Sequence, residues 1–518
     1  MGDRALLAEV DGLGEVLALH ARLEASRPEG VIDLVPAART VLVRVDGAAL
    51  TLAAARAWLE RAAATPEDAA IPADPAGHAG TPESTVELDV SYDGPDLADT
   101  AALLGLTPAE LIAQHSAAEW TVAFTGFAPG FGYLVSPGWR HEVPRLDTPR
   151  TRVPRGAVGL ASAFTGAYPR ETPGGWRLIA TTGARLFDAD AVPPASPVRL
   201  APGTRVRFRP ITSTPLSPSR ETATGRRVSP EGAIRVVEPG LLATIQDLGR
   251  AGSAALGIAP SGALDRRALR AANRLVGNAE GAAAIEVTMG GFRAIAARDT
   301  WFAVTGAWGP ILLDGRPVDP YEAHAWPRDA ELHVDWFAHG ARAYLAVRGG
   351  IEAPVSVGSR STDLLAGLGP AALRAGDALA IGDAPTAPVP VAEAWPWTPP
   401  HDDELEVALA RGARGDWFAA SAHDLLFAQP WTVTAHADRV GLRLDGPELP
   451  RTTTGELPSE GMVPGALQVP PSGRPTILLA DGPVTGGYPV IAVVTDAALD
   501  DLAQLRPGSR IRFRHART

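Results

Sequence analysis

The sequence predicts a mainly β protein, with tandem β-barrels behind a small α+β N-terminal domain, and three observations support this fold class. Short apolar runs interrupted by glycine and proline fill residues 120–211 and resume after residue 232, a pattern typical of closed barrels and sandwiches. Apolar residues at helical spacing are confined to a few segments. Short motifs also recur far apart in the chain, as they do in repeated domains.

The first 80 residues are predicted to form the α+β domain. Apolar residues recur at helical spacing over 13–25 and 52–64, which predicts two amphipathic helices. Between them, residues 31–35 and 41–45 alternate as paired strands do. Residues 64–84 are rich in Pro, Gly and Ala, and such a loose segment is expected where a domain ends.

Residues 81–212 are predicted to form the first barrel. Apolar residues alternate from Val86 to Tyr92, as in a half-buried strand. The motif Thr107-Pro108-Ala109-Glu110 is a capping box with proline at the first helical position, so a helix is expected through His115. The next segment, 213–232, is dense in Ser, Thr, Pro and charge and is predicted to be a linker.

Two further barrels are predicted in the rest of the chain. Residues 233–390 contain one clear helix, over 264–276, and Gly277 stands where a helix commonly ends in the left-handed conformation. A second linker, rich in Pro and Ala, spans about 384–400. Residues 391–518 are again β-rich and are predicted to form the last barrel.

Internal repeats support related barrels. Pro202–Phe208 matches Pro507–Phe513, and Ala375–Leu379 is a weaker third copy. Upstream, Thr165–Pro169 matches Thr485–Pro489. Repeats within one sequence indicate repeated structural units, so at least two, and with the third copy three, barrels are expected. The segments that begin at Thr165 and Thr485 are expected at equivalent places in two of them.

Composition excludes several classes of function. The 518 residues carry a formal net charge of −12, the wrong sign for binding nucleic-acid phosphates. No apolar run is long enough to cross a bilayer. The N-terminus shows no leader pattern, so a cytoplasmic protein is expected. Cysteine is absent, which excludes disulfides and thiolate chemistry, and the eleven histidines show no metal-ligand spacing, so no metal site is predicted.

Lysine is absent too, so all 47 basic residues are arginine. The chain therefore cannot form a lysine Schiff base, carry biotinyl-lysine or complete a P-loop. Any phosphate or carboxylate must be held by arginine, backbone N–H groups or a metal.

Two regions of the first barrel are candidate binding sites. The loop Gly126–Leu134 is dense in glycine and aromatic residues, which lets backbone approach a ligand at Gly130; a packed barrel turn explains the same composition. Arg150 and Arg152 would share one face of a strand and could clamp an anion, although a solvated strand face is an equal alternative. Tyr168 is the corresponding candidate in the repeated motif, as is Tyr488 in its second copy.

The later part of the chain offers further candidates. Gln246, Asp247 and Arg250 follow a turn, where Asp247 could act as acid or base but more simply caps backbone amides. Ser261 is interpreted first as a helix N-cap and second as an anion-binding hydroxyl. Small hydroxyl residues flank Arg360. Glu460, like Asp481, is a loop carboxylate of interest for proton transfer.

Taken together, these motifs resemble the carboxyltransferase-like family that contains the B and C subunits of 5-oxoprolinase, the Kip inhibitor and antagonist pair, and the carboxyltransferase region of urea carboxylase. The resemblance covers nearly the whole chain. Its B-like half is carried by Gly2–Leu6, Gly126–Leu134, Pro149–Gly156 and Thr165–Trp176. Its C-like half is carried by Glu238–Arg250, Pro260–Asp265, Ala272–Asn278, Gly358–Asp363, Glu456–Gly465 and Thr485–Pro489.

The resemblance implies cyclophilin-like barrels and a fused B–C component of an ATP-dependent 5-oxoprolinase. Its partners would be a separate A subunit and a small-molecule substrate, with neither nucleic acid nor membrane, and a homo-oligomer stays open. ATP with Mg²⁺ would be used and no biotin carried covalently. Arginines would stabilise phosphoryl charge, and Asp247 or Glu460 would handle protons. The chain departs from the family at Phe164, where glutamine is common, and at Val490, where lysine is common.

Two other functions remain open. A carboxyltransferase would move carboxylate from carboxybiotin to urea or a related amide, and would need a separate biotin carrier because this chain lacks lysine. A regulatory protein that binds a sensor kinase is the third possibility. Fusion of both halves favours an enzyme, since an inhibitor gains little from permanent linkage to its antagonist.

Overall fold

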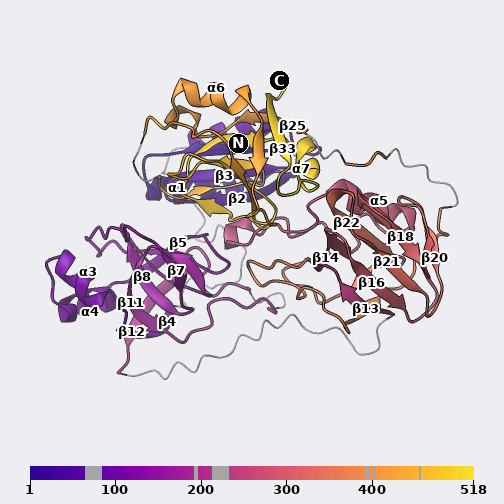
Figure 1. The fold of residues 1–518 in the computed structure, drawn as a ribbon. Coiled ribbons are helices and arrows are strands. Elements are labelled where there is room, and N and C mark those ends of the chain that lie inside the picture. The colour runs from indigo at the N-terminus through magenta and orange to yellow at the C-terminus, as the bar shows by residue number, and fades with distance from the viewer. Residues whose placement is uncertain are drawn as a thin grey trace.

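The computed structural model describes residues 1–64, 85–191, 196–212, 233–390, 397–400, 404–453, 455 and 457–517, and shows a mainly β protein (Figure 1). The predicted linker at 213–232 lies outside the described residues, as do most of 64–84 and part of 384–400. The domain boundaries placed there therefore remain predictions.

The N-terminal domain is a three-stranded antiparallel sheet, in the order β1-β3-β2, with two helices on one face. Both helices have the predicted bounds, because their apolar stripes pack Val16, Leu23 and Trp58 on the sheet. The elements are β1 (Ala5–Glu9), α1 (Leu13–Ala25), β2 (Val31–Pro36), β3 (Thr40–Val45) and α2 (Leu52–Ala64).

The first barrel is closed, in the strand order β11-β4-β12-β5-β6-β9-β8, and β4 and β12 pair in parallel. A separate two-stranded sheet joins β7 and β10. The strands are β4 (Val86–Ser91), β5 (Trp120–Thr125), β6 (Gly132–Val135), β7 (Arg150–Val153), β8 (Ala157–Ala161), β9 (Phe164–Ala167), β10 (Thr172–Gly174), β11 (Arg177–Thr182) and β12 (Arg205–Pro210).

Two helices, α3 (Leu97–Leu103) and α4 (Pro108–Ala117), precede β5. The predicted capping box is confirmed, since Glu110 N donates to Thr107 Oγ1 at 3.2 Å and Thr107 N donates to Glu110 Oε2 at 2.8 Å. His115 is fully buried and bonds Tyr92 Oη at 2.7 Å. Burial lowers the pKa of His115 to about 3, so its ring is neutral at pH 7.

The block from residue 233 differs from the closed barrel that was predicted. Its strands form a seven-stranded sheet, β19-β18-β21-β16-β13-β24-β23, and a five-stranded sheet, β14-β15-β22-β17-β20. One core that includes Phe292, Phe302 and Trp326 draws side chains from both sheets, as in a sandwich. The third repeat copy lies at β24, which pairs antiparallel with β13, whereas the other two copies lie in strands that pair in parallel with the first strand of a barrel.

The strands of this block are β13 (Ile234–Pro239), β14 (Leu242–Gln246), β15 (Ala284–Thr288), β16 (Phe292–Ala296), β17 (Thr300–Trp308), β18 (Ile311–Leu313), β19 (Arg316–Pro317), β20 (His324–Trp326), β21 (Glu331–Val334), β22 (His339–Val347), β23 (Ile351–Glu352) and β24 (Ala378–Ile381). The short helix η1 (Ala254–Leu256) and helix α5 (Arg266–Leu275) follow β14. The N-cap of α5 is Asp265, which accepts from Ala268 N at 2.9 Å, and not Ser261 as predicted.

The C-terminal block is a second closed barrel, in the order β25-β32-β29-β30-β27-β26-β33, and β28 and β31 form a small sheet. Its elements are β25 (Glu404–Arg411), η2 (Gly415–Trp417), α6 (Ala420–Ala428), β26 (Trp431–Val433), β27 (Gly441–Asp445), β28 (Glu460–Gly461), β29 (Ala466–Gln468), β30 (Thr476–Leu478), β31 (Thr485–Gly486), β32 (Val490–Val494), α7 (Asp496–Leu502) and β33 (Arg510–His515). Tandem barrels are thus confirmed for the first and last blocks.

The two barrels are equivalent strand by strand, but one predicted match is wrong. Thr165 lies in β9, inside its barrel, whereas Thr485 lies in the small sheet β28–β31, whose counterpart is β7–β10. Backbone bonds give the correct match, because Gly94 N donates to Ile179 O and Gly412 N to Ile491 O, both at 3.2 Å. Gly174–Ile179 therefore corresponds to Gly486–Ile491. Glycine and proline favour turns of many kinds, so the same Thr-Gly-x-Tyr-Pro motif occurs at two turns that are not equivalent in the two barrels.

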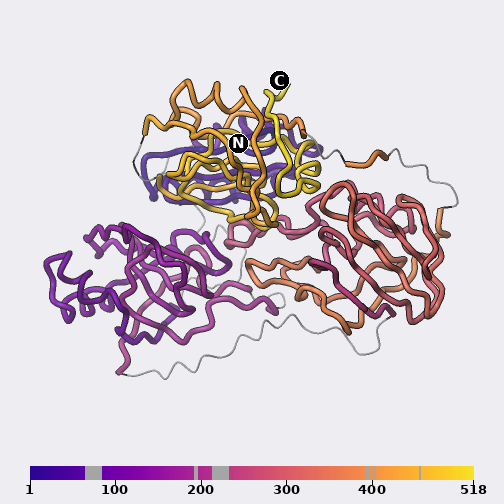
Figure 2. The backbone as a smooth tube through the Cα atoms, in the orientation of Figure 1, coloured from indigo at the N-terminus to yellow at the C-terminus, as the bar shows by residue number. Residues whose placement is uncertain are grey.

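The two ends of the chain lie together, as the indigo and yellow segments show (Figures 1 and 2). The sheet face of the N-terminal domain opposite its helices packs Val35 and Leu42 against Val463 and Val493 of the last barrel. Arg4 Nη2 donates to Val494 O at 3.1 Å. Among the described residues, no helix is both long and apolar enough to cross a membrane.

Candidate functional site

Several predicted residues meet in the middle block beside the last barrel, whose Ala480 O accepts from Ser261 N at 2.9 Å. Gln246 ends β14, Arg250 and Ser261 flank η1, and loop 356–363 folds over them. Gln246 is fully buried and Arg250 is 2% exposed. Gln246 Nε2 and Ser261 Oγ both donate to Thr362 O, at 2.9 and 3.3 Å. The 246–250 turn and loop 356–363 are therefore one hydrogen-bonded unit.

Asp247 holds this unit together. Its Oδ1 accepts from Ser359 Oγ at 2.6 Å and from Ser361 Oγ at 2.5 Å, and its Oδ2 accepts from Arg360 N at 2.7 Å. Gly249 N donates to Oδ1 at 2.8 Å. These four donors occupy both carboxylate oxygens of Asp247, and three of them tie its side chain to loop 356–363. Asp247 thus shapes the loop, which agrees with its simpler interpretation as a backbone cap.

Backbone strain gathers at the same place. Val357 has φ 50° and Ser261 has φ 52°, both in the left-handed region that L-residues disfavour, and a β-branched residue most of all. Such conformations persist where the surrounding structure enforces them, and they cluster at active sites and ligand clamps.

Four side chains of the unit each have a buried polar atom without a hydrogen-bond partner among the described residues. These atoms are Gln246 Oε1, Arg250 Nη1, Thr362 Oγ1 and Asp363 Oδ2; we call the four residues the polar cluster. Buried polar atoms are normally paired, because an unmade bond costs about 1 to 3 kcal/mol. A cationic donor, an amide acceptor, a hydroxyl and a carboxyl are groups of the kinds that bind small polar ligands in proteins.

The charges around the cluster are balanced by a buried network. Arg439 donates through Nε to Asp481 Oδ2 at 2.9 Å and through Nη1 to Glu286 Oε1 at 2.6 Å, which joins the last barrel to the middle block. Burial, with the Asp481 charge nearby, raises the pKa of Asp363 to about 6. Asp363 is therefore the carboxyl of the cluster that is poised to exchange a proton near neutral pH.

The other predicted arginines do not join this cluster. Arg360 Nη2 pairs with Glu352 Oε2 at 2.5 Å. Arg150 Nη2 pairs with Asp96 Oδ1 at 2.6 Å, whereas the side chain of Arg152 is 75% exposed and pairs with Glu171. Arg150 and Arg152 thus form separate ion pairs and not the two arms of one clamp.

Glu460 lies in a second buried site, against the N-terminal domain. Its Oε1 accepts from Arg414 Nε at 2.7 Å, Arg414 also pairs with Glu9 at 2.9 Å, and burial raises the pKa of Glu460. Its Oε2 has no partner among the described residues. Glu460 opposes Gly486 as Arg150 opposes Gly174, so the Arg414–Glu460 pair is the charge-reversed counterpart of Asp96–Arg150.

Of the remaining predicted residues, Gly130 lies at the junction of the two halves, and the two tyrosines differ in burial. Gly130 N donates to Leu256 O at 3.4 Å, and Phe127 N donates to Thr485 Oγ1 at 2.9 Å. Tyr168 is buried, with its ring 5.0 Å from that of Phe131. Phe127 has φ 65°. Tyr488 is 48% exposed.

Sequence reasoning missed four of the residues that build these sites. Thr362 and Asp363 end a motif that was singled out for its arginine, and the run of small hydroxyl residues before Asp363 was the available signal. Arg439 and Arg414 occur in no recognisable motif. Their partners lie 42 to 405 residues away, so no local pattern could identify them.

Comparison with known proteins divides the chain into two parts that match different family models. The family model described as carboxyltransferase domain, subdomain A and B, matches residues 256–515, and that described as subdomain C and D matches residues 1–197. The chain belongs to the carboxyltransferase-domain family. It fuses a half like the B subunit of 5-oxoprolinase to a half like the C subunit of that enzyme.

Individual relatives of this carboxyltransferase-family chain cover either half. It is 37% identical to the C subunit of 5-oxoprolinase from Escherichia coli strain K12, over 54% of this chain and 90% of that protein. It is 46% identical to the B subunit from Escherichia coli O157:H7, over 25% and 60%. The urea amidolyase of Lachancea kluyveri is 33% identical over 54% of this chain and 17% of its own length. The crystal structure of TTHA0988 matches with a TM-score of 0.85 at 36% identity, over 99% of both chains.

Proposed function

We propose that this chain is the B–C component of an ATP-dependent 5-oxoprolinase, which opens 5-oxoproline to glutamate together with a separate A subunit. The observation that carries the proposal is the polar cluster, four residues that each have a buried polar atom without a hydrogen-bond partner among the described residues. The likeness of the halves to the C and B subunits of 5-oxoprolinase supports it.

Opening of a lactam with ATP would use groups of the kinds found in the polar cluster. A lactam carbonyl is a poor electrophile. In the proposed reaction its oxygen attacks the γ-phosphorus of ATP and ADP leaves. One water then adds to the activated carbon and the ring C–N bond breaks, which gives the amine and an acyl phosphate. A second water hydrolyses the acyl phosphate to glutamate and phosphate. Arg250 Nη1 would stabilise negative charge on the oxygen, Gln246 Oε1 would accept the lactam N–H, and Asp363 would move a proton.

The proposed ATP reaction would use Mg²⁺. Among the described residues, no group of three His, Asp or Glu side chains could hold a metal ion, so we assign no step to Mg²⁺. A covalently bound biotin is excluded because the chain contains no lysine.

Variants of the cluster test the proposal in the complex reconstituted with the cognate A subunit. The unmodified chain alone should form little glutamate, and the complex should form it only with ATP. R250A and D363N should each lower kcat/KM by about 30-fold or more, since a buried charged contact costs roughly 2 to 5 kcal/mol. The matched control is R207A, whose side chain is 53% exposed. If both cluster variants keep full turnover with ATP, the cluster is not the reacting site.

The match to urea amidolyase favours a second candidate, carboxyl transfer from carboxybiotin to an amide. The two functions differ in what they consume. Transfer of labelled carboxylate from a separate carboxybiotin carrier to urea, without ATP, would support the second candidate and exclude the first.

A further inference from the structure

The small sheet β7–β10 of the first barrel is more exposed than its counterpart in the last barrel. Thr151, Arg152 and Pro173 are exposed. In the last barrel, Glu460 is 2% exposed because the N-terminal domain covers β28–β31. There Ala38 N donates to Ser459 O at 3.2 Å, and the side chain of Leu42 packs against Gly461.

The difference in exposure concerns two equivalent parts of the two barrels. The two small sheets occupy the same place in one barrel design, since Arg150 opposes Gly174 as Glu460 opposes Gly486. In one barrel this place receives an α+β domain of the same chain. In the first barrel no comparable domain covers this place among the described residues, and Thr151, Arg152 and Pro173 are exposed there.

An exposed apolar pair continues this surface. Leu364 and Leu365, directly after Asp363, are 47% and 49% exposed. Gly367, two residues after Leu365, lies near Arg170, since a methyl group on Gly367 would lie 3.6 Å from Arg170 Nη1, and Arg170 is two residues before β10. We call the exposed parts of β7–β10, with Arg170, Leu364 and Leu365, the docking face. An apolar centre with a charged rim is the usual anatomy of a protein interface.

The segments around the docking face have a charge opposite to that of the whole chain, which has a formal net charge of −12. Segments 144–155 and 170–177 contain six arginines and two acidic residues, and Asp96 pairs with Arg150 from outside them. The arginines are Arg145, Arg150, Arg152, Arg155, Arg170 and Arg177, and the acidic residues are Asp147 and Glu171. Such a patch fits a partner that presents acidic residues. Its net positive charge argues against a second copy of this chain presenting the same face.

The docking face also adjoins the polar cluster through the loop that carries Asp363 and Leu364. A partner seated there would lie against the reacting site, where an activated intermediate could be passed on without exposure to bulk water.

We propose that the docking face binds the third component of the complex, through acidic side chains that surround an apolar contact on Leu364 and Leu365. The inference rests on the proposed function, which requires that component. The partner surface should be acidic, and its affinity should fall as salt rises.

Binding of the purified cognate A subunit to the full chain tests this, by calorimetry at about 50 and about 300 mM salt, concentrations between which screening of exposed charges increases strongly. R152E and the double variant L364S/L365S should each weaken binding by about tenfold or more. Their controls are R207E and L241S, at an arginine whose side chain is 53% exposed and a leucine that is 65% exposed, both outside the docking face. Melting temperatures should match that of the parent, and R152K should retain binding.

The outcomes separate the two proposals. If the A subunit binds and activates parent and face variants equally, the docking face is wrong and the proposed function stands. If the A subunit neither binds nor activates the parent, both fail. If light scattering shows a dimer of this chain that L364S/L365S dissociates, the occupant is a second copy and the inference is overturned.

Discussion

Asp363 shows how one buried carboxyl can be costly for folding and useful for chemistry. Its Oδ1 accepts from Ala366 N at 2.8 Å, whereas its Oδ2 has no partner among the described residues. Burial raises its pKa to about 6, above the value of about 3.9 for a free carboxyl. Residues of this kind are retained where function needs them, at the expense of stability.

The first prediction is that D363N stabilises the protein at high pH. Between about pH 4 and pH 6 the unfolded chain has lost this proton and the folded chain keeps it, so the stability of the parent falls as pH rises through that window. The amide removes this cost, on the order of 1 to 3 kcal/mol above about pH 6. Melting temperatures at about pH 4 and about pH 8, on either side of the window, measure it. If D363N and the parent differed in melting temperature by the same amount at both pH values, the pKa of Asp363 would not be raised in the folded protein.

The second prediction concerns Asp247, which accepts bonds from Gly249, Ser359, Arg360 and Ser361. D247A should destabilise the protein by about 2 to 4 kcal/mol, because several buried donors lose their acceptor. D247N should retain part of that stability. Denaturant unfolding measures both, and a cost below about 0.5 kcal/mol for D247A, the range of an ordinary surface substitution, would show that Asp247 does not hold the loop.

At the scale of single elements, the junction between halves depends on close backbone approach. The Gly126–Leu134 loop meets β31, and Phe127 N donates to Thr485 Oγ1 at 2.9 Å. A methyl group on Gly126 would collide with Thr485 Oγ1. Glycine is needed here because another chain segment occupies the space of a side chain.

The third prediction compares two Gly→Ala variants. G126A should destabilise the junction by about 1 to 3 kcal/mol through this collision. The control is G14A in helix α1, where a methyl group meets nothing within 4 Å and helix propensity should add up to about 1 kcal/mol. The free energies of unfolding of both variants, measured under the same conditions, test this prediction. If G126A were more stable than the parent, Thr485 would have moved aside at no cost in stability.

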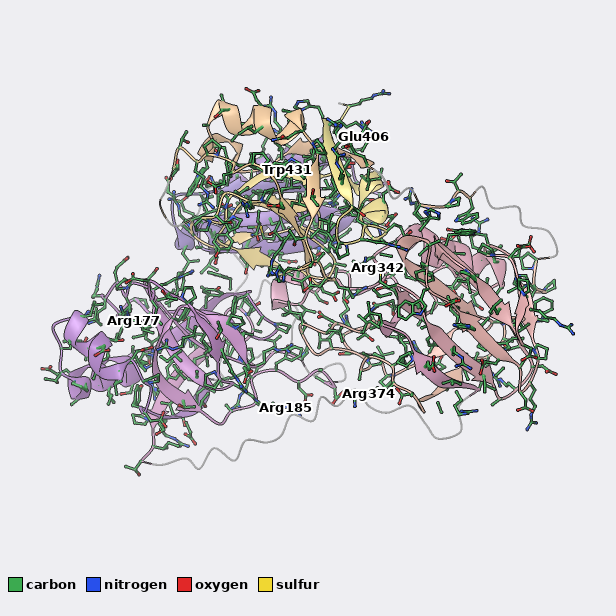
Figure 3. All side chains as sticks on the ribbon, in the orientation of Figure 1. Arg177, Arg185, Arg342, Arg374, Glu406 and Trp431 are labelled. Atoms are coloured by element: carbon green, nitrogen blue, oxygen red, sulfur yellow. The ribbon has the colours of Figure 1, made fainter. Side chains whose placement is uncertain are left out.

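At the scale of the whole molecule, the B-like and C-like halves are joined by non-covalent contacts as well as by the continuous chain. The N-terminal domain belongs to the B-like half but packs on the last barrel, which carries the labelled residues Glu406 and Trp431 (Figure 3). The first barrel contacts η1 of the C-like half, since Gly130 N donates to Leu256 O at 3.4 Å. This apolar contact, which includes Leu42 and Val463, resembles the core of an obligate interface.

The fourth prediction is that cutting the chain between the halves leaves a stable complex. With a protease site placed among residues 213–232, the two fragments should co-elute in size exclusion after cleavage. L42D should separate them, because a buried charge would face Met462 and Val463. The matched control is L17D, at a leucine that is 36% exposed on α1. Dissociation of the cleaved parent chain would contradict the prediction.

Amino-acid order alone settles the features whose causes are local. The helices 13–25 and 52–64, the capping box at Thr107 and the β-rich barrels follow from spacing and caps within a few residues. The family assignment follows from motifs, and the restriction of cationic groups to arginine follows from composition.

Tertiary structure decides what depends on pairing across the chain. It makes a sandwich of block 233–390, sets the true equivalence of the two small sheets, and brings Arg439 to Asp481 and Glu286. It also makes Asp247 an anchor of loop 356–363 and buries Asp363, which raises the pKa of that carboxyl to about 6. Strand partners and buried charge pairs are chosen by long-range register and by the energy of burial, which no short stretch of sequence encodes.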